Sequence, residues 1–221
     1  MDKPCKVAAH QPNFLPWAGF WHKVISADLF IVCTGIQYSK RSFSNRAKFS
    51  KDEVWATVPV THTATTYEGV KIANQDAVTQ IGRRLLHWGM QKKYTYRDRL
   101  NPVIERLLNN KSSSLTELNL DLIFLVAELL GEPRKKIIVD RSDWTNCHAK
   151  QKIPQLINQY GTEYLAGKSS LKYLSREDLS EVAHVYIQTM NADCPPYSVL
   201  HLIASKKHPR NYISRQGSWS Q

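Results

Sequence analysis

Several features that define common classes of protein are scarce or missing in this sequence. There is no CxxC pair, and the four cysteines are scattered along the chain, at positions 5, 33, 147 and 194. This spacing indicates free thiols rather than a disulfide framework or a cysteine-ligated metal site. The first residues also lack the apolar run of a signal peptide. We therefore expect a cytoplasmic protein, since reducing compartments keep thiols free.

Long hydrophobic runs are missing as well. The most apolar stretch, residues 118–130, is interrupted by Asn119, Asp121 and Glu128. A membrane span needs about 18 consecutive apolar residues, so we expect no membrane-spanning segment. The sequence has no GxSxG, Walker A or HExxH motif either, and these absences exclude the most easily recognised hydrolase, nucleotide-binding and zinc-protease signatures.

Acidic residues are few relative to basic ones. The chain has 19 aspartates and glutamates and 30 lysines and arginines, which gives a net charge of +11. Such an excess attracts anions. Nucleic acid, nucleotides and an anionic membrane surface are therefore candidate partners, and a merely basic, solvated surface is the alternative.

What the sequence does contain is a strand–loop–helix–strand pattern near its start. Residues 6–10 predict a short buried strand, which the prolines of the next loop end. A helix is expected over residues 18–27, where Phe20, Trp21, Val24 and Ile25 have helical spacing. Residues 29–33 form a continuous apolar run, typical of a strand buried on both faces. Together they predict a βαβ unit.

Strands and helices are expected to alternate along the rest of the chain. We predict a hairpin with limbs at 46–49 and 54–60, a strand at 69–73, helices at 76–92, 97–109 and 114–131, a strand at 136–140, a helix at 149–160, strands at 163–167 and 182–188, and a helix at 197–205. This alternation predicts an α/β fold: a mostly parallel, Rossmann-like sheet with flanking helices, a small β-hairpin and a helical insertion. We expect one domain over residues 1–221, with residues 74–131 as its helical subregion.

The carboxyl ends of the predicted strands indicate where a ligand binds. In open α/β sheets ligands lie beyond these ends. That rule selects four loops, at residues 10–17, 34–44, 140–148 and 167–175. Unusual residues gather in the first, second and fourth loops, so we expect the working site there. The third loop contains Cys147 next to His148, but neighbouring residues point in different directions, so this pair alone predicts no nucleophile.

The first loop carries an imidazole, two amides and an indole, from His10, Gln11, Asn13 and Trp17. The helix that follows offers free N–H groups to an anion. His10, or His22 on that helix, is a candidate general base because histidine titrates near working pH. Gln11 and Asn13 are candidates for holding a substrate carbonyl or hydroxyl group. The alternative is that the amides satisfy backbone groups and the rings pack in the core.

Basic and aromatic residues alternate in the second segment. Arginine binds phosphate through two parallel hydrogen bonds, lysine as a point charge, and an aromatic neighbour can stack on a base. The candidate binding residues are Gln37, Tyr38, Lys40, Arg41, Asn45 and Arg46. The turn after Gly167 adds Lys168, Ser169 and Ser170, either as a phosphate cradle or as a plain turn. The basic residues at 83–99 and 206–215 are expected to form solvated faces.

These motifs give the chain a resemblance to the WbqC-like family. The sequence has HQPNFLPW at 10–17, QYSKR at 37–41, NR at 45–46 and TVPV at 57–60, and residues 164–170 are similar to that family's glycine-containing turn. The resemblance implies a biosynthetic setting in bacteria or their viruses, often surface-polysaccharide synthesis. Thr34 and Gly35 stand where family members usually have two acidic residues, so a metal or proton-transfer role for those carboxylates is in doubt here.

A second likeness is to the HIGH-type nucleotidylyltransferases. Their order of strand, Gln-Pro, loop, helix and strand is similar, which suggests a related fold. In those enzymes two histidines flank a glycine and stabilise the transferring phosphate. The comparable stretch here, residues 17–20, has no histidine, so nucleotidyl transfer by that constellation is not expected.

Three hypotheses for function remain. The first is a transferase that attaches an amine, amino acid or acyl group to a phosphorylated or nucleotide-linked acceptor. The family context favours this class, and the net charge favours a modified base in nucleic acid as the acceptor. The second is a nucleotide-sugar modifying enzyme of surface polysaccharide (O-antigen) synthesis, and the third a non-catalytic nucleic-acid-binding protein. The sequence specifies no cofactor, metal or oligomeric state.

Overall fold

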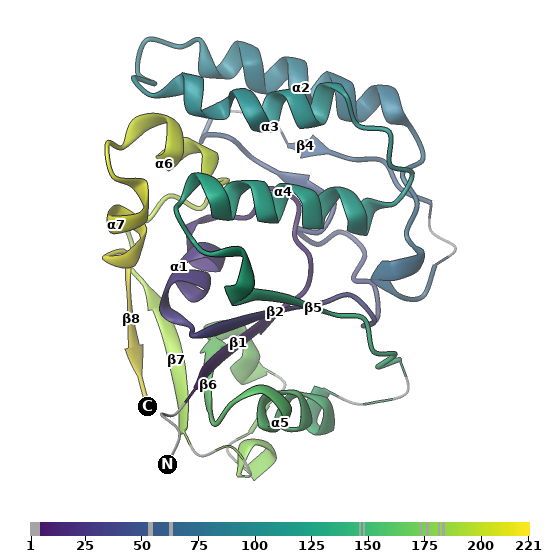
Figure 1. The fold of residues 1–221 in the computed structure, drawn as a ribbon, viewed down its shortest axis with the longest axis vertical. Coiled ribbons are helices and arrows are strands. Elements are labelled where there is room, and N and C mark those ends of the chain that lie inside the picture. Colours follow the sequence, from purple (N-terminus) through teal and green to yellow (C-terminus); the bar gives the residue numbers. More distant parts are fainter. Residues whose placement is uncertain are drawn as a thin grey trace.

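The computed structural model describes residues 5–52, 55–61, 64–145, 147, 149–172, 174–175, 177–180, 182 and 184–221. Val54, His148 and Ala183, on which parts of the predictions above fall, lie outside these residues. The main sheet has six strands, in the spatial order β5 (Ile137–Asp140), β2 (Leu29–Cys33), β1 (Lys6–His10), β6 (Glu163–Gly167), β7 (His184–Met190) and β8 (Gly217–Ser220). Figure 1 shows this sheet crossing the lower half of the molecule.

The sheet has Rossmann-like topology, as the sequence predicts. Its first five strands pair in parallel, and only β8 runs antiparallel, along β7. Numbered as the chain forms them, β1, β2, β5, β6 and β7 stand in the order 3-2-1-4-5. The strand order therefore reverses between β1 and β6. In doubly wound sheets the crevice at this reversal is the place where ligands bind.

Each face of the sheet has its own hydrophobic core. Along β2, Phe30 and Val32 contribute to one core, and Ile31 and Cys33 contribute to the other. All four side chains are buried, which agrees with the continuous apolar run. Alternate side chains of a strand point to opposite faces, so this strand needs no polar position.

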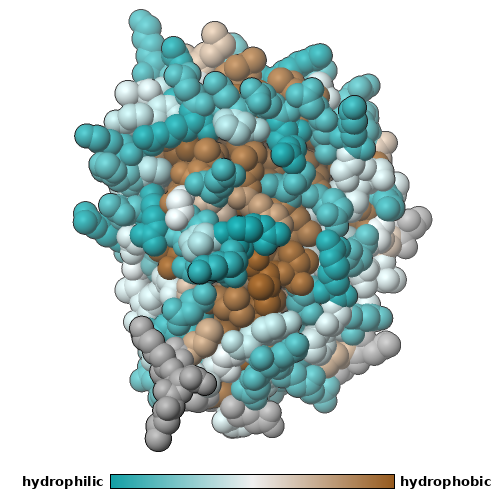
Figure 2. Space-filling model, in the orientation of Figure 1, coloured by the Kyte–Doolittle hydropathy of each residue, from teal (hydrophilic) through white to brown (hydrophobic). Residues whose placement is uncertain are grey.

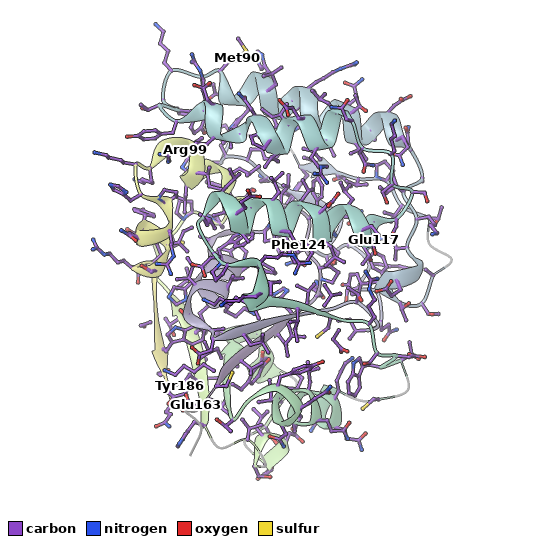
Figure 3. All side chains as sticks on the ribbon, in the orientation of Figure 1. Met90, Arg99, Glu117, Phe124, Glu163 and Tyr186 are labelled. Atoms are coloured by element: carbon purple, nitrogen blue, oxygen red, sulfur yellow. The ribbon has the colours of Figure 1, made fainter. Side chains whose placement is uncertain are left out.

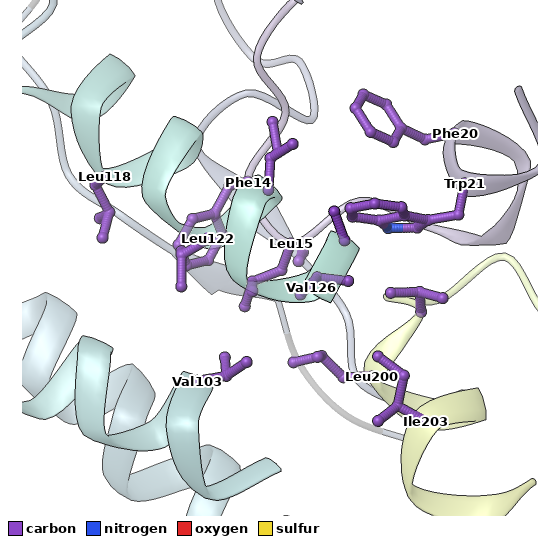
Figure 4. Close-up of a cluster of buried hydrophobic side chains, with 14 of the residues drawn as sticks. Phe14, Leu15, Phe20, Trp21, Val103, Leu118, Leu122, Val126, Leu200 and Ile203 are labelled. Atoms are coloured by element: carbon purple, nitrogen blue, oxygen red, sulfur yellow. The ribbon is translucent and has the colours of Figure 1, made fainter. Parts of the chain in front are cut away.

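Helices cover the two faces unequally. The larger core receives side chains from α1 (Ala18–Ser26), α2 (Gln75–Gly89), α3 (Asn101–Leu108), α4 (Leu115–Leu129), α6 (Leu200–Ser205) and α7 (Pro209–Ser214). The smaller core is covered by α5 (Ala149–Tyr160). Figure 1 shows α4 above the sheet, α2 and α3 as an outer layer beyond it, and α5 below. Figure 4 shows how side chains of the first loop, α1, α3, α4 and α6 converge in the larger core.

Local signals explain how the longer helices begin and end. The Ser114 side chain accepts a hydrogen bond from the Glu117 amide at 3.3 Å and caps α4, as the capping-box pattern predicts. The helix ends before Gly131, whose φ of +73° favours glycine. Asn74 caps α2 in the same way, accepting from the Ala77 amide. The predicted helix over 97–109 is α-helical only from Asn101, because Pro102 favours its first turn.

Short elements complete the chain. The predicted hairpin is present as β3 (Arg46–Ala47) and β4 (Ala56–Thr57), antiparallel and shorter than expected. Single-turn 3-10 helices occur at Tyr67–Gly69, Arg97–Leu100, Arg134–Lys136, Lys168–Lys172 and Glu177–Leu179. The predicted strand at 69–73 is wrong. Its residues make single bridges to two different segments, through Val60 and Ser114, so no ladder forms.

The C-terminal segment keeps basic residues on the surface but contains elements that were not predicted. Lys207, His208, Arg210 and Arg215 are exposed, as expected of a solvated basic face. The segment also contains α7, and β8 follows and pairs with β7. The Arg210 Nε donates to Oε1 of the buried Glu132 at 2.6 Å. A periodic pattern cannot indicate such short elements, since they form through tertiary contacts.

The molecular surface in the view of Figure 1 is mainly hydrophilic. Figure 2 shows hydrophobic residues at the centre of this face, over α4 and β5. One of them is Phe124, labelled on α4 in Figure 3, and the Arg134 guanidinium lies 3.3 Å from its ring centroid. In the part of the chain that the structure describes, no helix has the length and apolar character needed to cross a membrane.

Candidate functional site

A cavity of about 740 Å³ opens at the carboxyl edge of the sheet. His10 at the end of β1, Cys33 at the end of β2 and Gly167 at the end of β6 all line it. Because β1 and β6 flank the point where the strand order reverses, the cavity occupies the crevice expected of a doubly wound sheet.

The two predicted loops meet beside this cavity. The Gln11 Nε2 donates hydrogen bonds to Oδ1 of Asn13 at 3.1 Å and to Oγ of Ser44 at 3.3 Å. The Phe14 amide donates to the carbonyl oxygen of Phe43 at 3.0 Å. Side chains of both loops line the cavity, among them Gln11, Asn13 and Phe43. The loops are therefore held together by direct hydrogen bonds.

A residue of α4 adds a second connection between the loops. Asn119 is fully buried, and its Nδ2 donates to the Pro12 carbonyl oxygen at 2.9 Å and to the Ser44 carbonyl oxygen at 2.7 Å. Sequence reasoning treated Asn119 only as an interruption of an apolar run. A polar residue on the buried face of a helix was the available signal, because buried amides are normally hydrogen-bonded.

His10 is held as a neutral imidazole with one free acceptor. Its Nδ1 lies 3.0 Å from the Gln11 carbonyl oxygen. A carbonyl can only accept, so Nδ1 carries the proton and Nε2 keeps its lone pair. Burial, and to a smaller extent the nearby charge of Lys23, lower the pKa of His10 to about 3. The edge of Phe20 fixes the ring, with centroids 5.1 Å apart.

Lys23 contributes a poorly exposed amino group to the cavity. This residue of α1 is only 6% exposed and lines the cavity. A Cβ at Gly167 would lie 3.8 Å from its Nζ and 3.8 Å from the Ser169 Oγ, so the ammonium lies at the end of β6. No hydrogen bond or ion pair reaches it from the described residues. Burial lowers the pKa of Lys23 to about 7.

A second lysine lies across the cavity, on α5. Lys152 is half-buried, its Nζ is 5.5 Å from the Trp144 ring centroid, and burial lowers its pKa. The neighbouring Cys33 thiol has a pKa raised to about 12, first by burial and then by Asp140. That carboxylate accepts from Trp144 Nε1 and Ser142 Oγ, both at 2.6 Å. Cys33 is therefore a neutral thiol, unsuited to be a nucleophile.

Several of the predicted residues lie elsewhere. His22 does not line the cavity. Its Nδ1 accepts from Gln188 Nε2 at 3.0 Å, and its ring stacks on Trp219 with centroids 5.3 Å apart. Burial lowers its pKa. These contacts give His22 a packing role between α1 and the edge of the sheet.

The basic residues at 40–46, in and just after the second site loop, do not place their charged groups in the cavity. Lys40 and Arg41 are exposed, and Arg46 Nη2 donates to the Arg41 carbonyl oxygen at 2.6 Å. The Arg46 guanidinium lies 4.7 Å from the Trp55 ring centroid. The Asn45 Nδ2 donates to the Val58 carbonyl oxygen at 2.9 Å. None of these four predicted residues lines the 740 Å³ cavity.

Of the remaining predicted residues, some line the cavity and others lie outside it. Trp17, Ser169 and Ser170 line the cavity, whereas Lys168 does not. Gln37 is exposed and bridges Thr66, and Tyr38 is buried with its ring 5.2 Å from that of Tyr67. Sequence reasoning missed the lining residues Lys23, Ser39, Phe43 and Lys152 as site residues.

The position of the family's acidic pair has no room for a carboxylate. A Cβ at Gly35 would lie 1.9 Å from the Ser142 carbonyl oxygen, and the buried Thr34 Oγ1 donates to the Asp140 carbonyl oxygen at 3.2 Å. A larger residue at 35 would displace the loop after β5. Among the described residues no three His, Cys, Asp or Glu side chains group as metal ligands.

Fold and cavity together define an α/β protein with a ligand cavity at the switch point of a Rossmann-like sheet. The two loops that border the cavity also carry the motifs HQPNFLPW and QYSKR. The chain belongs to the WbqC-like protein family, whose model matches residues 11–202. It is 25% identical over 187 residues to the uncharacterized protein Rv1507c of Mycobacterium tuberculosis, covering 80% of this chain and 79% of that one. No solved structure matches it significantly.

Proposed function

We propose that the protein is a group transferase that attaches a small amine, amino-acid or acyl group to a phosphorylated or nucleotide-linked acceptor. The size and lining of the cavity support an acceptor of this kind. Its volume of about 740 Å³ falls within the roughly 300–1,000 Å³ of small-molecule sites. Apolar walls with a few polar groups, here His10, Gln11, Asn13 and Ser169, suit an aromatic or sugar ring with defined hydrogen bonds.

The single observation that carries the proposal is the poorly exposed ammonium of Lys23, which lines the cavity and has no hydrogen-bond or ion-pair partner among the described residues. A charge removed from water without a partner destabilises the folded state. A phosphate group in the cavity would supply the missing partner and restore the charged form of the lysine. Ser169 Oγ, which like the ammonium would lie 3.8 Å from a Cβ at Gly167, offers a hydroxyl donor to the same anion.

His10 supplies a proton acceptor beside this anion site. An amine or hydroxyl group of the acceptor attacks the carbonyl carbon of an activated acyl or aminoacyl donor, and the free Nε2 of His10 can take the proton of the attacking group. The bond between that carbon and the donor's leaving group breaks as the new bond forms. With Lys23 charged and unpaired, the low pKa makes His10 a weak base. An anion bound at Lys23 cancels part of that positive charge, so the pKa of His10 rises when substrate is present. Substrate binding therefore strengthens the base.

The rival hypothesis of a purely non-catalytic nucleic-acid binder accounts less well for the cavity. Surface lysines and arginines are sufficient to neutralise a phosphate backbone. A buried lysine at the bottom of a cavity adds nothing to that and lowers stability. The family's biosynthetic setting, which the sequence motifs imply, also favours turnover.

Ligand binding is the first test. Inorganic pyrophosphate and nucleoside mono- and diphosphates should raise the thermal midpoint of the wild type, and the corresponding nucleosides should raise it much less. At 100 times Kd the stabilisation is about 2.7 kcal/mol. Lys23→Met should lose this shift. Lys40→Ala/Arg41→Ala should keep it, because both residues are exposed and outside the cavity.

Turnover is the second test. The protein is incubated with a small-molecule extract of bacterial cells, and mass spectrometry compares the mixture before and after. A phosphorylated compound should gain the mass of a small group with wild type and with the Lys40→Ala/Arg41→Ala variant. Lys23→Met and His10→Gln should give no product. If neither phosphorylated ligands nor phosphorylated products depend on Lys23, the proposal fails.

A further inference from the structure

Three hollows follow one another on the surface, and two aromatic side chains separate them. Phe43 lines both the 740 Å³ cavity and a small cleft next to it. Trp55 lines both this cleft and an open groove of about 400 Å³ beside α2. The cavity is thus the end of a longer track, which we call the Phe43–Trp55 track. A ligand that fits it has to be an extended chain.

Both aromatic side chains of the track are exposed. Phe43 is 52% exposed and Trp55 is 39% exposed, with ring centroids 5.9 Å apart. Among the described residues the other exposed large hydrophobic side chains, Leu86 and Met90, lie on or just after α2 and line none of the three hollows. Aromatic rings left in solvent beside a cavity are typical of a surface that stacks on planar groups.

Basic side chains surround the aromatic pair. The Arg46 guanidinium and the Lys48 ammonium lie 4.7 and 5.7 Å from the Trp55 ring centroid. No carboxylate of the described residues pairs with either. Arg84 approaches from α2, where its Nη1 donates to the Trp55 carbonyl oxygen at 3.4 Å. The track therefore combines stacking surfaces with positive charge at Arg46 and Lys48, and Asp76 is an acidic residue that lines the groove beside α2.

We infer that the track binds single-stranded nucleic acid and leads an acceptor nucleotide of that strand into the cavity. This inference rests on the proposed function, and it names the acceptor class. Stacked bases and neutralised phosphates are the two interactions by which proteins hold single strands. A duplex keeps its bases stacked inside, out of reach of Phe43 and Trp55. A neutral glycan can stack on aromatic rings but gives Arg46 and Lys48 no counter-charge.

The test measures binding of a fluorescein-labelled oligothymidylate of about 12 nucleotides, within the usual range of site sizes, to the full chain at low salt. Phe43→Ala and Trp55→Ala should each weaken binding about 5- to 100-fold, the usual range for loss of one stacked base. Phe43→Tyr and Trp55→Phe should stay within about 3-fold of wild type, because an aromatic face remains. Thermal midpoints establish that each variant is folded.

A matched control tests whether any aromatic residue with a nearby cation has the same effect. Tyr96 has the Arg99 guanidinium 4.3 Å from its ring centroid but lines none of the three hollows; Figure 3 labels Arg99 at the edge of the molecule. Tyr96→Ala should bind the oligothymidylate like wild type. Dextran sulfate, a polyanion without bases, should bind Trp55→Ala and wild type equally.

Three results would overturn the inference: unchanged oligothymidylate binding in folded Phe43→Ala and Trp55→Ala, an equal loss of dextran sulfate binding in these variants, or preferential binding of a neutral glycan. Trp55→Ala separates the inference from the proposed function. Trp55 does not line the cavity, so this variant should keep the nucleoside-phosphate shift while its oligothymidylate binding weakens. If the nucleoside-phosphate shift depends on Lys23 but the oligothymidylate does not bind, the proposed function survives with a free nucleotide as acceptor and the track is refuted. If the oligothymidylate binds through the aromatic pair but no phosphorylated ligand depends on Lys23, the track survives without the transferase.

Discussion

The most consequential residue is Lys23, because its two protonation states do different things. Charged, it attracts a phosphate group but destabilises the empty protein. Neutral, it costs little to bury but has no charge for an anion. Since its pKa is lowered to about 7 by burial, both states are populated near neutral pH. The cavity is therefore poised to take up a proton together with its anion.

Lys23→Met should make the dependence of stability on pH different from that of wild type. Between pH 7 and 10.5 the unfolded chain keeps a proton on Lys23 that the folded protein has released. Wild-type stability therefore rises across this window relative to the variant, by about 4–5 kcal/mol in total. Below pH 7 the variant should be the more stable protein. Urea unfolding at pH 6.5 and 9.5 measures this, and a constant difference between the two proteins would contradict it.

His10 should remain neutral throughout the pH range in which most enzymes work. Its pKa is lowered to about 3, so its ring resonances in a histidine NMR experiment should not titrate between pH 8 and 5. Its contribution to stability is present above pH 6.5 and is lost as pH falls toward 3. Saturating pyrophosphate should raise the pKa, because it offsets the charge of Lys23. A midpoint near 6.5 in the free protein would refute this account.

Sequence alone located the cavity and six of its lining residues, but it did not select Lys23. The strand-end rule placed the site at the loops after β1, β2 and β6, where the cavity is. His22 and Lys23 are neighbours on α1, and no local pattern distinguishes which of the two side chains reaches the cavity. Every residue from Ala18 to Val24 is buried. This part of the helix therefore has no exposed polar face that hydrophobic periodicity could distinguish from a buried one. Only the packing shows that His22 turns to Gln188 and Lys23 to the cavity.

At the scale of elements, α4 determines whether the two site loops stay together. Asn119→Ala removes both hydrogen bonds to the Pro12 and Ser44 carbonyl oxygens and leaves these buried acceptors unsatisfied. We expect a loss of about 2–4 kcal/mol in stability and a smaller nucleoside-phosphate shift in the fraction that remains folded. Asp121→Asn, on the exposed side of the same helix, breaks only a surface ion pair with Arg106.

The Asp121 variant is the control for this experiment, because exposed ion pairs contribute about 1 kcal/mol or less. Urea unfolding compares the two variants, and titration with pyrophosphate compares their binding. Equal stability of both variants would mean that Asn119 does not join the loops in solution. Reduced stability with normal binding would limit its role to the core.

Elements with strong local signals were predictable, and those made by tertiary contacts were not. The first βαβ unit, the capped helix α4 and the strand β6 match the predictions within a few residues. The helix predicted from residue 197 begins only at Leu200. Ser198 before it bridges Trp17 and donates to the Lys48 carbonyl oxygen. A distant part of the chain holds Ser198 outside the helix, and no local pattern records that.

At the scale of the whole molecule, one buried carboxylate connects the C-terminal segment to the rest of the fold. Glu132, after α4, accepts from Lys136 Nζ at 3.0 Å and from Arg210 Nε on α7 at 2.6 Å. Lys136 Nζ also donates to the Ile25 carbonyl oxygen at the end of α1, at 2.9 Å. Three segments far apart in the sequence therefore meet at this side chain.

Glu132→Gln should destabilise the protein by about 3 kcal/mol, because it leaves the poorly exposed Lys136 without a counter-ion. Arg210→Ala should cost about 1 kcal/mol or less, because Arg210 is half-exposed and Glu132 keeps its other partner. Urea unfolding at low and high salt measures both. The Glu132 effect should persist in high salt, since buried pairs are weakly screened, whereas the Arg210 effect should shrink. If Arg210→Ala costs as much as Glu132→Gln, then docking of α7, rather than the buried charge, stabilises this junction.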